Sequence, residues 1–474
     1  MANGSDFTGP APELLDAVVR TAARGGGRRA EVFVEDRSSL SLRLEDGKIE
    51  DALSGVDLGA SVRVIRGLST EFGYVDAVDE ASLLRLAGEL ARSGPGSAPA
   101  GKTTLLPVSA VRPVPATPTP AGDAARARAA ANASLLRLAD QTARGLSGEV
   151  RQVVAVYGES QQRVWIADSD GGSNSDRRIR KMIAVSVMAQ RGALLQVGRE
   201  TLAVQGSLQD FTDDEIAALA QTAAQKALVM LDSVPAPAGR MPVVLANGFG
   251  GVLFHEACGH GLEADYILKK TSVWEGKKGQ RIAGEHVFAY DDGVGEGMWG
   301  SARCDDEGTP CQRTTVIEAG ILTNYLTDRL RGGYLGLPLT GNGRRQDYRH
   351  MPYPRMTNTY FGPGAYKAEQ IVADTPRALY AKSLSGGEVN PATGDFVFGV
   401  AEGYLIEGGR ITTPVRGATL IGSGTEVLLN IDAIADDLAL QPGTCGKEGQ
   451  GVSVGSGQPT IRIRELTVGG TNLG

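Results

Sequence analysis

Residues 253–265 read LFHEACGHGLEAD and hold two of the four histidines in the 474-residue chain. A glutamate directly follows the first histidine, so His255, Glu256 and His260 form the pattern His-Glu-x-x-x-His. This spacing is one residue longer than the His-Glu-x-x-His helix of zinc peptidases. Residues five apart lie about 140° apart around a regular α-helix, which therefore cannot direct both histidines at one ion. Either the helix carries a one-residue expansion or ends between the histidines, or this common dipeptide recurs by chance.

The composition is that of an ordinary globular protein, with 42% hydrophobic and 22% charged residues. The length exceeds what one hydrophobic core fills, so two or three domains are expected. The formal net charge of −7 argues against a nucleic-acid-binding surface. The N-terminal residues lack the pattern of a signal peptide, and no apolar run reaches membrane-spanning length. With only four cysteines, we expect a cytoplasmic protein with reduced thiols and no membrane contact.

The pattern of apolar residues predicts an α+β fold in several parts. In residues 1–93 the pattern predicts a two-layer α+β unit, in which helices pack on an antiparallel sheet. It predicts a second unit of the same kind in residues 123–237. The proline-rich residues 94–122 between them predict a linker or edge segment. Residues 238–474 are rich in glycine and short strand patterns, which predicts a β-rich, barrel-like domain. This domain carries the helix with the two histidines, and Asn247 is expected to cap that helix.

A zinc peptidase needs three protein ligands, an open coordination position and a general base. Glycines flank His260 and favour a local deviation from the regular helix. Among possible third ligands, Cys445 ranks first, because it lies in the glycine-flanked residues 443–449, expected to be a loop. Cys258 is interpreted as a small buried hydrophobic residue. By residue type alone the alternatives stay open, and they include nearby acids and His286, His350, Cys258, Cys304 and Cys311.

The His-Glu stretch and several later ones resemble the TldD/PmbA family, specifically its TldD-type metallopeptidase subunit. The matching stretches follow the family's order through most of residues 242–470, whereas the first 240 residues match in layout rather than in motif. Besides the histidine stretch they are residues 305–310 (DDEGTP), 339–345 (LTGNGRR), 354–360 (PRMTNTY), 394–398 (GDFVF), 417–424 (GATLIGSG), 445–450 (CGKEGQ) and 455–460 (GSGQPT).

The resemblance implies a zinc-dependent peptidase, a hydrolase of peptide bonds, with one zinc ion per chain. His255, His260 and Cys445 would hold the zinc, and the cysteine would come from far along the chain. Glu256 would be the general base that takes a proton from the zinc-bound water and passes it to the leaving amine. Cys258 stands where the family is expected to have an apolar residue.

A group that stabilises the transition state is also expected. Arg344, His350 and Tyr353 are candidates for this role and for substrate binding, because of their residue types and their closeness to residues 340–345 (TGNGRR). Extended peptides are expected to pair with an exposed sheet edge, which would make binding tolerant of sequence.

The resemblance also implies a partner. TldD-type chains form a heterodimer with a PmbA (TldE)-type subunit that lacks the metal motif, and the pair encloses a chamber that admits unfolded peptides. Family members are linked to the maturation of ribosomally made peptide antibiotics and to the degradation of small antitoxins. Self-association is the alternative to a paralogous partner. The alternative functions are a biosynthetic amidase or peptidase for one small precursor, and an inactive binding subunit, against which the complete motif argues.

Overall fold

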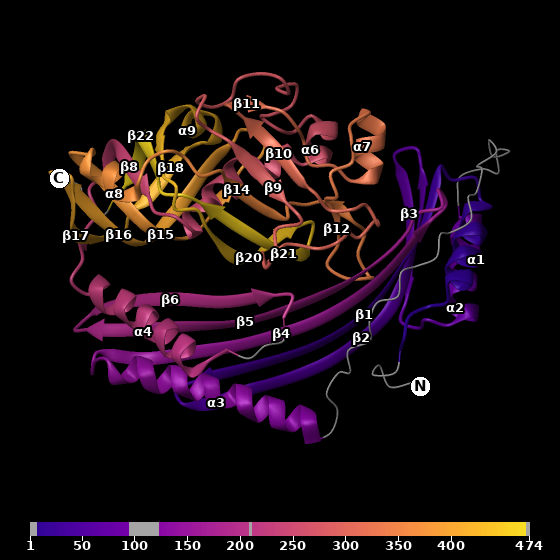
Figure 1. The fold of residues 1–474 in the computed structure, drawn as a ribbon, viewed down its shortest axis with the longest axis horizontal. Helices are drawn as coiled ribbons and strands as arrows, with labels where there is room; N and C mark the ends of the chain where they lie inside the picture. The colour runs from indigo at the N-terminus through magenta and orange to yellow at the C-terminus, as the bar shows by residue number, and fades with distance from the viewer. Residues whose placement is uncertain (1–6, 94–122, 208–210, 471–474) are drawn as a thin grey trace.

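The structure is a computed structural model that describes residues 7–93, 123–207 and 211–470. It consists of a long curved sheet with helices on its outer face and a β-rich body that lies over the inner face (Figure 1). The predicted α+β class is thereby confirmed. The predicted linker at residues 94–122 lies outside the described residues.

The curved sheet has six antiparallel strands in the order β3-β2-β1-β4-β5-β6. Strand β1 pairs with β2 on one side and with β4 on the other, so strands from residues 1–93 and from residues 123–237 share one sheet. The expected domain boundaries stay a prediction. The strands are β1 (Arg29–Glu45), β2 (Lys48–Arg66), β3 (Ser69–Val75), β4 (Val150–Asp168), β5 (Ser173–Arg191) and β6 (Leu194–Gln205).

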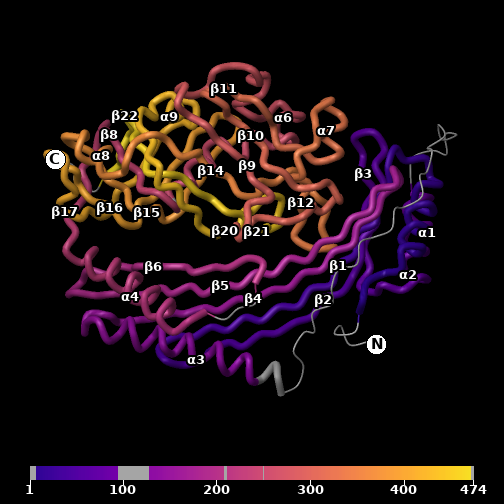
Figure 2. Tube along the Cα trace, viewed as in Figure 1, coloured from indigo at the N-terminus to yellow at the C-terminus, as the bar shows by residue number. Residues whose placement is uncertain are grey.

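Two pairs of helices cover the outer face of the curved sheet, one pair at each end (Figures 1 and 2). Helices α1 (Pro12–Ala23) and α2 (Glu80–Arg92) bury their apolar faces against one end. Helices α3 (Asp123–Gly145) and α4 (Asp213–Met230) cover the other end.

Buried ion pairs connect the inner face of the sheet to the β-rich body. A nitrogen of Arg63 lies 2.8 Å from Glu31 on the neighbouring strand and also binds Glu307 of the body. A nitrogen of Arg345, in the body, lies 3.0 Å from the other oxygen of Glu31. These four side chains are at most 1% exposed, so the charges neutralise one another across the junction.

The β-rich body contains a closed barrel, which confirms that expectation. Strand β15 pairs with both β8 and β16, so the path β15-β8-β22-β18-β16 returns to its start. Strands β7 (Val234–Pro235), β17 (Arg410–Arg416) and β19 (Ile431–Ile434) flank this ring. The barrel strands are β8 (Gly239–Leu245), β15 (Arg377–Val389), β16 (Asp395–Glu407), β18 (Thr419–Ser423) and β22 (Ile461–Gly469).

A second sheet of the body has the order β11-β10-β9-β14-β21-β20. Its edge strand β20 (Ala439–Lys447) forms a hairpin with β21 (Gln450–Gln458). The other strands are β11 (Ile321–Leu322), β10 (Arg313–Glu318), β9 (Ala289–Asp292) and β14 (Asn358–Phe361), with the separate pair β12 (Gly343–Arg344) and β13 (Tyr353–Pro354). Short helices α6 (Ala264–Lys269), α7 (Arg329–Leu335), α8 (Ala368–Ala373) and α9 (Gly424–Asn430) lie between strands.

The prediction of a loop at residues 443–449 is wrong, because residues 439–447 form strand β20. Proline and several glycines give this stretch a weak strand propensity, and its pairing with β21 supplies what the local sequence lacks. Glu448 and Gly449, both with positive φ, make the tight turn of the hairpin. Among the described residues, none of the helices has the length and apolar character needed to span a membrane.

Candidate metal centre

The two histidines lie on a helical segment that follows β8 and changes its winding at the motif. The segment runs through a short 3₁₀ turn and α5 (Val252–Phe254) into a π-helical turn at His255–Gly259 and a 3₁₀ turn at His260–Leu262. The backbone N–H of His260 donates to the carbonyl of His255, five residues earlier. This is the one-residue expansion that the spacing predicts, and it places both side chains on one face.

The π-helical turn is closely packed. A Cβ atom at Gly259 would lie 2.2 Å from Sδ of Met356, and one at Gly424 would lie 2.3 Å from the carbonyl oxygen of Ala257. An alanine at either position would therefore force neighbouring atoms to move. The prediction that Asn247 caps the helix is wrong, because the N-cap of α5 is Gly251, and the side-chain nitrogen of Asn247 donates to the carbonyl of Asp437 at 2.7 Å.

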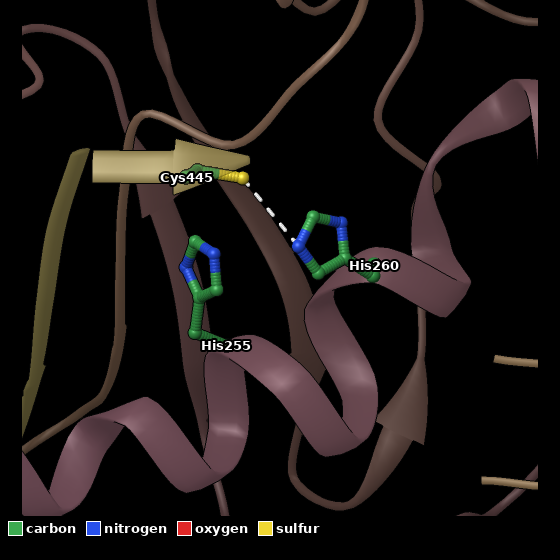
Figure 3. Close-up of side chains that lie close together, drawn as sticks. All are labelled: His255, His260 and Cys445. Atoms are coloured by element: carbon green, nitrogen blue, oxygen red, sulfur yellow. Dashed lines mark hydrogen bonds between the residues drawn. The ribbon is translucent and has the colours of Figure 1, made fainter. Parts of the chain in front are cut away.

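Strand β20 brings Cys445 to the two histidines (Figure 3). One donor atom from each of His255, His260 and Cys445 lies within 4.8 Å of the others. Sγ of Cys445 is 3.4 Å from Nε2 of His260, which is 185 residues away in sequence. The imidazole rings stand at 88° with centroids 5.1 Å apart. All three residues are buried, so the donors converge in a site largely closed to bulk water.

Polar neighbours orient the two imidazoles. Nδ1 of His260 is 3.0 Å from a carboxylate oxygen of Glu263, which leaves Nε2 directed at the thiol. Nδ1 of His255 is 3.4 Å from the hydroxyl of Ser456 on β21. Nζ of Lys447 in turn lies 2.8 Å from Glu263. A carboxylate behind a ligating imidazole fixes its orientation and raises its basicity.

The electrostatics of the site favours a thiolate at Cys445. Burial opposes ionisation of the thiol, but His260 and His255 outweigh it, and the pKa of Cys445 lies well below its ordinary value. Burial also lowers the pKa of His260, but Glu263 and Cys445 hold that pKa well above its ordinary value. Burial likewise opposes ionisation of Glu263. Lys447 and His260 outweigh this effect and lower the pKa of Glu263 to about 2. A thiolate is the form of cysteine that binds metals.

The donor set fits a zinc ion. Zinc binds imidazole nitrogen and thiolate sulfur in tetrahedral sites, in which two such donors stand roughly 3.5 Å apart. The 3.4 Å between Cys445 and His260 matches this spacing. Glu256 stands beside the donors, with a carboxylate oxygen 3.9 Å from Nε2 of His260, and about a quarter of its side chain is exposed. It is therefore close enough to meet a water molecule at the site.

The remaining predicted residues occupy other positions. Both terminal nitrogens of Arg344 donate to backbone carbonyls, so this side chain ties strands together. Nδ1 of His350 is 2.7 Å from the carboxylate of Asp347, and Tyr353 packs against the guanidinium of Arg331. None of these contacts involves the three donors, and the roles of Arg344, His350 and Tyr353 stay predictions.

The alternative third ligands lie outside the donor group found among the described residues. Cys258 is 2% exposed and belongs to the main hydrophobic core, as its interpretation as a small apolar residue predicts. Cys304 and Cys311 are buried, and Nε2 of His286 is 3.0 Å from the carbonyl oxygen of Ile431. Sequence reasoning missed Glu263 and Lys447. The position of Glu263 three residues after His260 could have indicated that its carboxylate contacts this imidazole.

Three models of one protein family match successive parts of the chain. Residues 30–93 match domain 1 of the PmbA/TldA metallopeptidases, residues 122–231 match the central domain, and residues 238–470 match the C-terminal domain. A metalloprotease TldD homolog from Haemophilus influenzae is 39% identical over 455 residues, which cover 94% of this chain and 93% of the relative. A zinc metalloprotease TldD homolog from Saccharolobus solfataricus is 33% identical over 317 residues, which cover 66% and 68%.

The fold also has a close counterpart among solved structures. The crystal structure of TldE from Thermococcus kodakarensis superposes with a TM-score of 0.75, covering 96% of this chain and 99% of that one. The sequence identity is 17%, so this likeness concerns the fold.

Proposed function

Because the chain belongs to the PmbA/TldD metallopeptidase family, we propose that it is a zinc-dependent catalytic subunit that hydrolyses peptide bonds in unfolded or small peptides. The convergence of His255, His260 and Cys445 carries this proposal, since the helical segment and β20 together provide three zinc-type donors. The zinc metalloprotease from Saccharolobus solfataricus supports the choice of metal.

The chain's own residues perform the proton transfers in this mechanism. Zinc held by the three donors would polarise the scissile carbonyl and make nearby water more acidic. Glu256 accepts a proton from the attacking water and delivers it to the nitrogen that leaves when the peptide bond breaks. Its partial exposure and its 3.9 Å distance from Nε2 of His260 support this role. Glu263 keeps His260 oriented while this occurs.

The position of Cys445 supports an extended substrate. Strand β20 is at the end of its sheet, so one edge is free of strand pairing among the described residues. A peptide that adds a strand there would be held by its backbone and pass close to the donors, with little dependence on sequence. A cavity of about 890 Å³ touches this strand at Gln441 and Pro442 and is also lined by residues 195–201 of β6, while its described lining includes none of the three donors.

The partner in this proposal is a PmbA/TldE-like subunit. The likeness of the chain's fold to TldE supports it, because two chains of one fold can form a pseudo-symmetric pair. Co-expression of the chain with such a subunit, followed by size-exclusion chromatography, distinguishes this pair from association of the chain with itself.

The proposed function is tested on the purified chain, alone and with that partner. Unfolded peptides are incubated with and without a chelator, and the products are identified by mass spectrometry. We expect about one zinc per chain and cleavage that the chelator abolishes. Glu256→Gln should keep its zinc and lose roughly 10²–10⁴-fold in rate, the usual contribution of a general base.

The matched control is Glu369→Gln, which changes an exposed glutamate on α8 and should leave the rate unchanged. Full activity in Glu256→Gln, or far less than one zinc per chain after careful purification, would contradict the proposal. Cleavage confined to one precursor peptide would instead favour a dedicated processing enzyme with the same chemistry.

A further inference from the structure

Lys447 is a buried lysine on the strand that carries Cys445, two residues beyond it. Its side chain is 3% exposed, and Nζ lies 2.8 Å from Oε2 of Glu263 and 2.7 Å from Oδ1 of Asp265. Both carboxylates directly follow the histidine-bearing turns, and they are at most 1% exposed. A lysine is rarely this buried unless it is paired, so the contact must compensate for a large loss of hydration.

These contacts close a ring around one side of the metal centre. Sγ of Cys445 contacts Nε2 of His260, whose Nδ1 contacts Glu263. Glu263 binds Lys447, and the backbone of β20 leads from Lys447 back to Cys445. Residues two apart on a strand point to the same face, so the cysteine and the lysine both face the helical segment. The lysine therefore connects the two elements that supply the donors.

We propose that Lys447 is a positioning residue that fastens β20 to the histidine-bearing segment and thereby sets the place of Cys445 relative to His260. This inference rests on the proposed function, because it takes the three donors to be zinc ligands. Strand β20 needs such an attachment, since it pairs with β21 on one side only. Arg355 holds the carbonyl of Cys445 from the backbone side, whereas Lys447 acts on the side-chain face.

The carboxylates depend strongly on this ammonium group. Oε1 of Glu263 and Oδ2 of Asp265 are buried without a hydrogen-bond partner. Removal of the ammonium would leave two neighbouring buried carboxylates with too little compensation. Glu263 would then be free to turn away from His260, and β20 would lose its side-chain link to the segment.

The test measures zinc affinity by competition with a chromophoric chelator, so that it does not depend on peptidase activity. Lys447→Gln should bind zinc 10–100-fold more weakly than the wild type, as expected for loss of a partner behind the ligands. Cobalt(II) replaces zinc in a second measurement, in which the thiolate-to-cobalt absorption should weaken because Cys445 is displaced. The matched control is Lys367→Gln, which removes an exposed lysine–aspartate pair and should change neither reading.

A second variant keeps the test decisive if Lys447→Gln does not fold. Lys447→Met combined with Asp265→Asn removes one buried charge of each sign and keeps Glu263 behind His260, and it should show the same loss of affinity. In a Cys445→Ser background, Lys447→Gln should have a smaller further effect, because the part that acts through the cysteine is already lost. Wild-type affinity and a full thiolate band in either lysine variant would overturn the inference.

Failure of the proposed function would look different. In that case the wild type would bind no stoichiometric zinc, and Cys445→Ser would have the same affinity as the wild type. If only the positioning role is wrong, Cys445→Ser loses affinity while the lysine variants keep theirs.

Discussion

Replacing Gly259 with alanine tests whether the π-helical turn sets the metal affinity, beyond the identity of the ligands. The new Cβ would lie 2.2 Å from Sδ and 3.1 Å from Cε of Met356. Ordinary contacts between such atoms are about 3.5–4.0 Å, so one side must move by roughly 1.5 Å. Met356 is itself fully buried, and its thioether has little free space into which it can retreat. The π-helical turn must therefore also move.

The expected magnitude follows from two opposing effects. Overpacking a buried site costs about 1–3 kcal/mol, whereas alanine is favoured over glycine in a helix by about 1 kcal/mol. The free energy of unfolding should therefore fall by up to about 2 kcal/mol. Because His260 directly follows Gly259, we expect the displaced turn to weaken zinc binding by about tenfold, which corresponds to 1.4 kcal/mol.

The assay is a zinc competition titration, with thermal unfolding of the metal-free chain alongside. Gly446→Ala is the matched control, because this glycine adjoins Cys445 but a Cβ added to it would meet no atom within 4 Å. Adding Met356→Ala to Gly259→Ala should restore zinc affinity, even though the shortened side chain lowers thermal stability. Wild-type affinity in Gly259→Ala, or no recovery in the double variant, would refute the reasoning.

Three further predictions concern the third ligand, the sheet junction and pH. Cys445→Ser should lose its zinc and Cys258→Ser should keep it, as metal analysis of the purified variants will show. Arg63→Met should lower the free energy of unfolding by about 3–5 kcal/mol, because it leaves buried Glu307 without its arginine and Glu31 paired with Arg345 alone. Urea denaturation should show almost no change in Arg20→Met, which removes a partly exposed pair. Burial raises the pKa of Glu35 from 4.5 to about 7, so the folded chain holds a proton that the unfolded chain releases, and stability should fall by about 3 kcal/mol as the pH rises from 4.5 to 7. Urea midpoints across this range should show no such fall in Glu35→Gln.

Local sequence predicted the parts of the fold that depend on local interactions. The outer helices of the two predicted α+β units depend on local features such as the cap at Asp79, whose carboxylate accepts a hydrogen bond from the backbone of Ser82 at 2.8 Å. The spacing of His255 and His260 predicted the irregular helix, because the geometry of a regular one excludes a common target. These features need only neighbours within a few residues.

The parts that sequence reasoning missed depend on contacts between distant residues. Strand β20 is stabilised by pairing with β21 and not by its own residues, which is why Cys445 was expected in a loop. Its assignment as the third ligand came from the family resemblance, because composition and spacing leave several thiols and histidines equivalent. Lys447 gave no local signal at all, since its carboxylate partners lie more than 180 residues earlier.

The extra residue in the motif gives the site a geometry that a regular helix does not provide. In the π-helical turn His255 and His260 share a face, as their hydrogen bond across five residues requires. Glu256 lies four residues before His260 in the sequence. In this turn the carboxylate of Glu256 is 3.9 Å from Nε2 of His260. Two donors and the proposed base are thus presented together to Cys445. Wide turns of this kind are rare and often mark functional sites, and here the tight approach at Gly259 supplies the packing that holds one in place.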